Sequence, residues 1–410
     1  MLFAPVLSRF IRIGRLTVID AAGGRHVFEG ARGPAAAIRL HHPALHRKLL
    51  ANPRLCVPEA YMDGTLTIEE GSLYDFIDLL TANDVALDDS LPMRLAAAGK
   101  RLVRRAYQYN PVPQSRRNVA HHYDLSDQLY ELFLDSDRQY SCAYFRSPNE
   151  DIDTAQQNKK RHIAAKLLLQ PGTRVLDIGS GWGGLALYLA GECDADVTGL
   201  TLSEEQFKVA NRRAAAAGLA DRVRFYLRDY REESERYERI VSVGMFEHVG
   251  VNQYPTFFRK LRTLLAPDGV ALLHSIGRME GPGATNPWLR KYIFPGGYSP
   301  ALSEVVPHAE RARLWITDIE ILRLHYAETL RAWRARFAHN RDRIRALYDE
   351  RFCRMWEMYL VGCELAFRRG GHVVFQMQLA RKIDAVPLTR DYMLDWERAR
   401  SLREAAGRAA

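Results

Sequence analysis

Long apolar runs are absent from this chain of 410 residues. Its longest ones, such as residues 270–273, fall far short of the roughly 18 residues of a membrane-spanning helix, so we expect no integral membrane protein. We also expect no secretory signal peptide, because Arg9, Arg12 and Arg15 interrupt the short apolar stretch at the N-terminus. With 47% hydrophobic and 26% charged residues, the composition is that of a globular protein.

Cysteine is scarce, and its spacing points to no cross-linked framework. No Cys-x-x-Cys pair occurs, and the odd number of cysteines argues against the disulfides of a secreted protein. We therefore expect a cytoplasmic protein, and we expect no metal site. The five cysteines are Cys56, Cys142, Cys193, Cys353 and Cys363.

Acidic residues are outnumbered by basic ones. The chain has 49 Asp and Glu against 58 Lys and Arg, which gives a net charge of +9. Such an excess permits an anionic partner, either a nucleic acid or a phospholipid surface, and does not choose between them. Between residues 94 and 117 every charged residue is basic, which predicts either a solvated face or a surface that binds anions. These residues are Arg94, Lys100, Arg101, Arg104, Arg105, Arg116 and Arg117.

The chain divides by pattern into four parts. In the first part we expect strands at 16–19 and 37–40 and helices at 43–52 and 73–80. An apolar stripe from Leu2 to Ile11 is typical of a helix packed on its own domain, and it also fits a helix lying in a membrane interface. The four parts are a small α+β domain at 1–88, a basic linker at 89–120, the main domain at 121–390 and a tail at 391–410.

The main domain alternates short apolar strands with helical stretches. This alternation predicts a doubly wound, mostly parallel sheet of the α/β class. We expect residues 300–385 to be largely helical. The expected strands are 174–178, 196–200, 223–225, 239–243 and 269–275, and the expected helices between them are 185–190, 204–217 and 255–265.

The strongest local motif is the turn at residues 179–184, which reads Gly-Ser-Gly-Trp-Gly-Gly. It matches G-x-G-x-x-G between a strand and a helix, where glycine lets the backbone approach a ligand closely. A nicotinamide site would need an acid at the end of the second strand, which here ends at residues 198–201 without one. Asp177 instead stands directly before the glycines, and this order is typical of S-adenosylmethionine methyltransferases.

Further motifs give a more specific resemblance, over residues 115–385. The chain carries Tyr-Ser-Cys-Ala-Tyr-Phe at 140–145, Phe-Glu-His-Val-Gly at 246–250 and Tyr-Ile-Phe-Pro-Gly-Gly at 292–297. With these motifs in this order, it resembles the cyclopropane fatty acid synthase family, which includes the mycolic acid cyclopropane synthases. The N-terminal domain is similar to the extra domain of the bacterial members that act on phospholipids. The resemblance implies a Rossmann-like class I methyltransferase domain.

The resemblance also implies two sets of site residues. Each side chain has a structural alternative, such as a small core residue for Cys142, a helix cap for Glu247 or a core aromatic for Tyr326. The residues implied to bind S-adenosylmethionine are Tyr140, Ser141, Asp177, Gly179, Gly181, Thr201, Gln206, Asp229 and Tyr230. Those implied to hold a bicarbonate ion at the catalytic centre are Cys142, Glu247, His274, the backbone at Ile276, and Tyr326.

The implied reaction transfers a one-carbon unit from S-adenosylmethionine to the cis double bond of unsaturated phospholipid acyl chains. A carbocation deprotonated by bicarbonate would then close to a cyclopropane, whereas other fates would give a methyl-branched or methylene fatty acid. A nucleic-acid methyltransferase is a more distant alternative, because no RNA-binding module is present. A protein that binds the cofactor without catalysis is another. We expect peripheral association with an anionic membrane and no nucleic-acid partner, and we leave a homodimer open.

Overall fold

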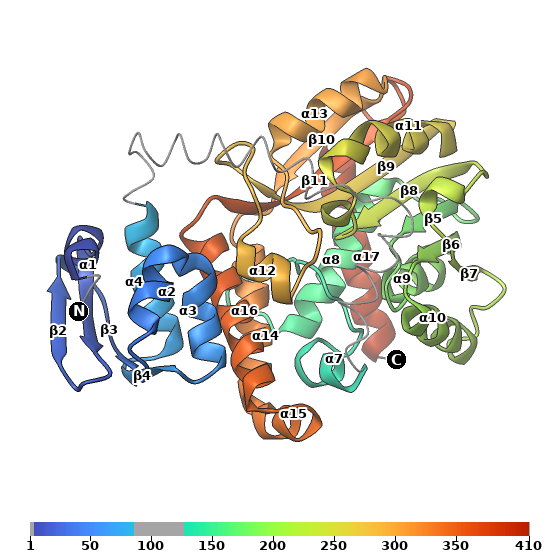
Figure 1. Ribbon diagram of the computed structural model, residues 1–410. Coiled ribbons are helices and arrows are strands. Elements are labelled where there is room, and N and C mark those ends of the chain that lie inside the picture. Colours follow the sequence, from blue (N-terminus) through green and yellow to red (C-terminus); the bar gives the residue numbers. More distant parts are fainter. Residues whose placement is uncertain (1–3, 86–126, 410) are drawn as a thin grey trace. The chain divides into compact units, whose positions relative to one another are not determined.

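The computed structural model describes residues 4–85 and 127–409 (Figure 1). The basic run at 94–117 lies outside these residues. The chain divides into two compact units, of which the first contains residues up to 85 together with 283–295 and 327–372. The second contains the other described residues, 127–282, 296–326 and 373–409. Within the described residues, no helix combines the length and the apolar character needed to cross a membrane.

The division differs from the linear one expected from the sequence, because two later segments join the first unit. Helix α16 (Glu350–Arg368) packs against α3 (Pro53–Met62) and α4 (Leu73–Val85). Helix α12 (Pro287–Tyr292) also packs against α3. The apolar faces of these helices pack together although the helices lie far apart in the sequence. A domain division based on local sequence pattern cannot detect such packing.

The first unit contains a four-stranded sheet of order β2-β1-β3-β4. Strand β3 pairs in parallel with β1, and the other two pairings are antiparallel. The predicted strands and helices of this α+β part are present, with additional elements between them. The strands are β1 (Ile13–Ile19), β2 (Arg25–Glu29), β3 (Ala31–Leu40) and β4 (Leu66–Glu70), and the further helices are α1 (Ala4–Phe10), α2 (Leu45–Ala51) and α15 (Arg341–Leu347).

The N-terminal apolar stripe packs on its own unit where the structure describes it. Leu7 and Phe10 of α1 pack against the buried core beneath the sheet, and Ile11 is part of that core. Val6 faces outward, with 54% of its surface exposed. The described part of the stripe therefore closes the core of the first unit.

The second unit is built on a seven-stranded sheet of order β10-β11-β9-β8-β5-β6-β7 (Figure 1). Strand β9 pairs in parallel with β8, β8 with β5, β5 with β6 and β6 with β7, while β10 and β11 pair antiparallel with each other. This confirms the predicted doubly wound, mostly parallel sheet. The strands are β5 (Arg174–Ile178), β6 (Asp196–Thr201), β7 (Val223–Leu227), β8 (Tyr237–Val243), β9 (Leu265–Arg278), β10 (Trp315–Ile321) and β11 (His372–Ala380).

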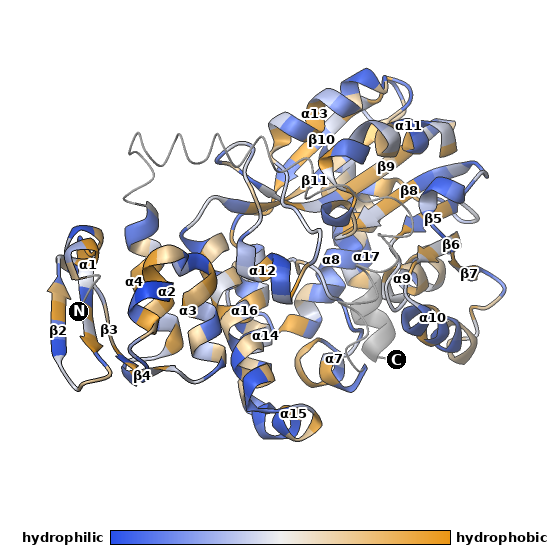
Figure 2. Ribbon diagram, in the orientation of Figure 1, coloured by the Kyte–Doolittle hydropathy of each residue, from blue (hydrophilic) through white to orange (hydrophobic). Residues whose placement is uncertain are grey.

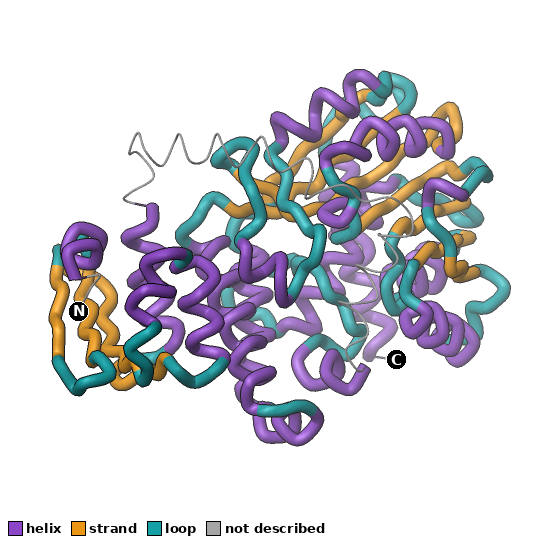
Figure 3. Tube along the Cα trace, in the orientation of Figure 1, coloured by secondary structure: helices purple, strands orange, loops and turns teal. Residues whose placement is uncertain are grey.

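Helices cover both faces of this sheet (Figure 3), and a separate apolar core fills each side. On one face lie α8 (Ile152–Leu167), α9 (Gly184–Cys193) and α10 (Glu204–Ala216), and on the other lie α11 (Tyr254–Leu264) and α13 (Leu302–Arg311). The C-terminal helix α17 (Asp391–Ala409) packs on α8. Strand β9 is mainly orange in Figure 2, in contrast with the bluer α10. The strand order reverses between β5 and β8, which is where ligands bind in such sheets.

The expectation that residues 300–385 are largely helical is wrong for two segments. Strands β10 and β11 lie within this range and pair with each other. In β11 the buried positions include Gln376 and Gln378, which are 0% and 1% exposed. Polar residues at buried strand positions hide the apolar pattern by which a strand is recognised in a sequence.

Candidate active site

The glycine turn lies between β5 and α9, at the reversal of strand order. Gly179, Gly181 and Gly183 have φ values of 85°, 55° and 84°, in the left-handed region that favours glycine. A Cβ atom added to Gly179 would lie 2.8 Å from Cβ of Met245, whereas one added to Gly181 would meet no protein atom within 4 Å. The turn is therefore packed against protein at Gly179 and open at Gly181.

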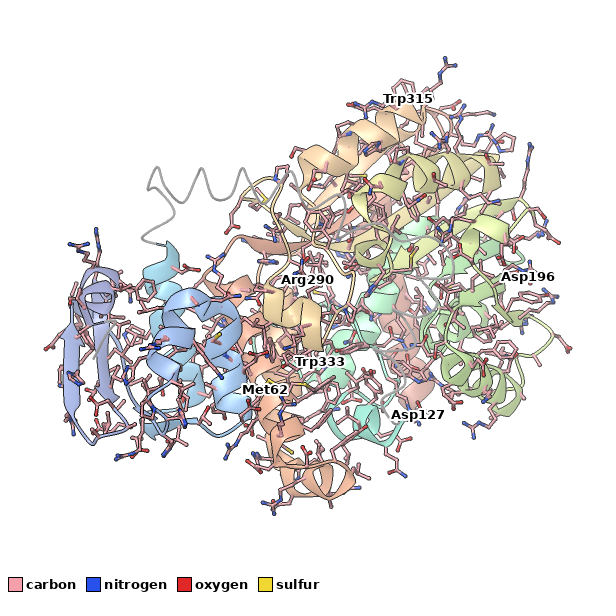
Figure 4. All side chains as sticks on the ribbon, in the orientation of Figure 1. Met62, Asp127, Asp196, Arg290, Trp315 and Trp333 are labelled. Atoms are coloured by element: carbon pink, nitrogen blue, oxygen red, sulfur yellow. The ribbon has the colours of Figure 1, made fainter. Side chains whose placement is uncertain are left out.

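A cleft opens beside this turn and encloses, together with its mouth, about 560 Å³. Helix α7 (Asp127–Phe133) helps to fix the turn, because Trp182 Nε1 donates a hydrogen bond of 3.2 Å to Asp127, which is labelled in Figure 4. Six predicted cofactor residues line the cleft, namely Tyr140, Ser141, Asp177, Gly179, Gly181 and Gln206.

Asp177 has the electrostatic character expected of a residue that binds a cation. It is the penultimate residue of β5, is 1% exposed, and its Oδ2 atom has no hydrogen-bond partner among the described residues. Burial raises the pKa of this carboxyl to about 7, against the opposing influence of Lys159. A buried acceptor without a partner at a cleft fits a ligand that brings positive charge or donors.

Lys159 is a residue of the cleft that the sequence reasoning missed. It lies on α8, is fully buried, and lines the cleft beside Asp177. Its Nζ atom donates to Gln139 Oε1 at 2.6 Å and to Ser141 Oγ at 2.8 Å, which holds the segment that carries Tyr140. Burial lowers the pKa of this ammonium to about 8. The polar run around it gives no sign of burial, so no signal in the sequence distinguishes it from a surface lysine.

Three of the predicted cofactor residues do not line the cleft. Thr201 lies behind Gln206 and donates a hydrogen bond of 2.9 Å to its Oε1 atom. Asp229 accepts hydrogen bonds from the backbone and side chain of Arg231 at the start of η1 (Tyr230–Glu232). Tyr230 packs in the apolar core against Phe257, with ring centroids 5.5 Å apart. The structure thus surrounds Asp229 and Tyr230 with protein partners.

A second cluster forms where β8 and β9 end. Glu247 lies on η2 (Phe246–His248), and its Oε1 atom accepts a hydrogen bond of 2.6 Å from Ile276 N. Its Oε2 atom is buried without a partner among the described residues. Burial raises the pKa of this carboxyl to about 7, although the Ile276 hydrogen bond lowers it. Gly244, which lines the cleft, donates its N–H to the His274 carbonyl at 3.0 Å, so the cleft and the cluster adjoin.

Cys142 and Tyr326 belong to two neighbouring segments of the same unit. Cys142 is 2% exposed and Tyr326 is 8% exposed. Tyr326 is the second residue of α14 (His325–His339), and the preceding His325 accepts a hydrogen bond of 3.0 Å at Nδ1 from Phe145 N. The segment that carries Cys142 therefore runs beside the start of this helix. His274, on β9, is 2% exposed.

Comparison with known proteins finds relatives over most of the chain. The model of the family described as mycolic acid cyclopropane synthetase matches residues 112–377. A probable fatty acid methyltransferase of Pseudomonas putida is 37% identical over 84% of this chain and 86% of its own length. The cyclopropane-fatty-acyl-phospholipid synthase of Escherichia coli K12 is 37% identical over 85% of this chain and 89% of its own.

A solved structure agrees with these sequence relatives. The mycolic acid cyclopropane synthase CmaA1, complexed with SAH and CTAB, is 34% identical to this chain, with a TM-score of 0.62. The match covers 67% of this chain and 99% of that one. SAH is the demethylated product of S-adenosylmethionine, which agrees with a cleft suited to that cofactor. The chain therefore belongs to the mycolic acid cyclopropane synthetase family and is an S-adenosylmethionine-dependent methyltransferase.

Proposed function

We propose that this enzyme transfers a one-carbon unit from S-adenosylmethionine to the cis double bond of unsaturated acyl chains in membrane phospholipids, which gives cyclopropane fatty acids. The observation that supports this most directly is the junction at Gly244 between the cofactor cleft and the buried cluster of Glu247 and His274. The names of the Escherichia coli and Pseudomonas putida relatives support the same substrate class.

The proposed chemistry explains why a buried acid and a buried histidine adjoin the cleft. Bound S-adenosylmethionine would supply an electrophilic methyl carbon, which a weakly nucleophilic alkene can attack as the methyl–sulfur bond breaks and S-adenosylhomocysteine leaves. The acyl chain is left with a carbocation, and loss of a proton from the new methyl group closes the ring. The task of the protein is to exclude water, which would capture the cation, and to place a base beside it.

We infer that the base is a bicarbonate ion held by Cys142, Glu247, His274 and Tyr326. The buried Oε2 atom of Glu247 fits this role, because a carboxyl with a pKa of about 7 is partly protonated at neutral pH and can donate to an anion. The N–H of Ile276 is already bonded to Oε1 of Glu247. An anion that accepted a hydrogen bond from the Ile276 N–H would therefore share this donor with the Glu247 carboxyl.

The product distinguishes this function from its alternatives. Incubation with labelled S-adenosylmethionine and unsaturated phospholipid vesicles should transfer label to lipid, and mass spectrometry of the released fatty acids should show a gain of CH₂. An exocyclic methylene product has the same mass but keeps olefinic protons, and a methyl-branched product has two more hydrogens. The name of the Pseudomonas putida relative makes a fatty acid methyltransferase the second candidate. Label that enters RNA and not lipid would contradict the proposal.

Cofactor binding should depend on pH through Asp177. Below its pKa of about 7 the carboxyl is protonated, so a cationic ligand must displace a proton in order to bind. We expect affinity to rise about tenfold per pH unit up to that pKa and then to level off, while Lys159, with a pKa of about 8, keeps its charge. Calorimetry across this window measures the dependence. Asp177→Asn should bind more weakly and without the slope, whereas a flat profile in the parent enzyme would exclude a linked proton at Asp177.

The membrane prediction concerns the basic run at 94–117. A basic residue near an anionic surface contributes on the order of 1 kcal/mol, and the interaction weakens as the Debye length falls to about 3 Å at 1 M salt. Reversing the charges at Arg101, Arg104 and Arg105 to glutamate should therefore reduce sedimentation with anionic vesicles and leave cofactor binding unchanged. The matched control reverses the same number of charges at the exposed Arg32, Arg47 and Arg212. Equal sedimentation of the test variant and the parent would place the docking face elsewhere.

A further inference from the structure

We propose that Gln376, held by Lys166, is a positioning residue that fixes His274 as the neutral tautomer with its proton on Nε2. This inference deepens the proposed function and rests on the role given there to His274. It assigns that histidine the part of a hydrogen-bond donor and excludes it as the base.

The tautomer follows from a chain of two hydrogen bonds. Lys166 Nζ lies 2.7 Å from Gln376 Oε1, and Gln376 Nε2 lies 3.1 Å from His274 Nδ1. An ammonium can only donate, so the amide must turn its oxygen toward Lys166 and its nitrogen toward His274. The amide nitrogen also only donates, so Nδ1 must accept and carries no proton. All three side chains are 2% exposed or less, so water does not compete for these bonds.

The orientation of Gln376 is secured by charges behind Lys166. Lys166 Nζ contacts the Glu320 carboxylate, which also accepts a hydrogen bond of 2.7 Å from His162 Nε2. The other ring nitrogen of His162 contacts Glu397 on α17. Each buried charge of this network therefore faces an opposite charge, the arrangement in which buried ions are stable. A paired, cationic Lys166 keeps the amide from flipping.

The surroundings of His274 keep its ring neutral. Burial lowers its pKa well below the ordinary value, and the positive charges of Lys159, Lys166 and His162 act in the same direction, against Glu320. His274 and Leu272 are two residues apart on β9, so both side chains point to the sheet face covered by α8. That face also carries Lys159, whose charge acts on both Cys142 and His274. His274 can therefore donate a hydrogen bond through its Nε2–H group on the sheet face covered by α8.

The test replaces Gln376 with glutamate, which has nearly the same shape. A carboxylate opposite Nδ1 accepts a hydrogen bond, so the proton should move to Nδ1 or the ring should become charged. Nitrogen NMR of the enzyme labelled at histidine distinguishes these states, and the His274 signal is identified by its loss in His274→Gln. We expect kcat to fall about 10- to 100-fold, as for other residues that fix a ring tautomer, with the Kd of S-adenosylmethionine unchanged.

Gln378→Glu is the matched control. Gln378 lies two residues further along β11, is also buried, and donates to Lys166 O at 2.6 Å and to the hydroxyl of Tyr392 at 2.8 Å without contacting His274. The Gln378→Glu variant should lose about as much stability as Gln376→Glu does. Its His274 should keep the Nε2–H tautomer, and most of the kcat should remain. An Nδ1–H signal in the parent enzyme would overturn the inference whatever the activity. Equal losses of kcat in both variants with an unchanged tautomer would also overturn it.

The outcome is separable from that of the proposed function. An enzyme that binds S-adenosylmethionine but modifies no unsaturated lipid would refute the function. The NMR signal of His274 would still show whether Gln376 sets the tautomer, because that measurement needs no turnover.

Discussion

Gly181→Val is expected to abolish S-adenosylmethionine binding while the protein stays folded. A Cβ atom at this position meets no protein atom within 4 Å, so a branched side chain would extend into space that the cofactor needs. The left-handed φ of 55° adds strain of about 1–3 kcal/mol, which a large domain tolerates. Calorimetry should detect no binding, and the thermal unfolding transition should stay cooperative.

Gly172→Val separates strain from obstruction. Gly172 has a φ of 77° and open space around its Cβ position, and it lies before β5, away from the residues that line the cleft. It should lower the unfolding temperature about as much as Gly181→Val does and keep the affinity of the parent enzyme. If Gly181→Val binds the cofactor as tightly as this control, the open side of the turn is not the cofactor site.

Removal of bicarbonate is expected to cause the second large effect, a loss of turnover that returning bicarbonate reverses. A positioned base contributes about 10²- to 10⁴-fold to a rate, so thorough depletion should slow lipid modification by at least about 10²-fold. S-adenosylmethionine binding should be unaffected, because the proposed anion site is at Glu247 and not at the glycine turn.

Glu247→Ala tests which group holds the anion. Alanine has neither the oxygen that accepts from Ile276 N nor the protonated oxygen that would donate to the anion. We expect the variant to be slow and to respond little to added bicarbonate. Glu304→Ala, which removes the carboxylate that bonds the Tyr298 hydroxyl and caps α13, serves as the control and should respond fully. Unchanged turnover in depleted buffer would mean that a side chain is the base.

Much of the second unit could be predicted from the sequence because its signals are local. Segments such as 174–178 and 239–243 each place three apolar residues within a stretch of five, which is typical of short buried strands. The positive φ values at Gly179 and Gly181 belong to a turn in which each glycine is required by its own backbone conformation. Asp177 is recognisable because it directly precedes that turn.

Only the tertiary structure decided the positions of the buried polar residues. Lys159 has polar sequence neighbours typical of a protein surface, and Lys166 and Gln376 stand as single polar residues among apolar ones, yet each is at most 1% exposed. Their burial is stable because the partners that satisfy them come from distant segments, as Gln376 does for Lys166 across 210 residues. A polar residue is tolerated inside a protein only with such a partner. The local sequence shows the residue but not the partner, and therefore it could predict the glycine turn but not the polar layer behind the cleft.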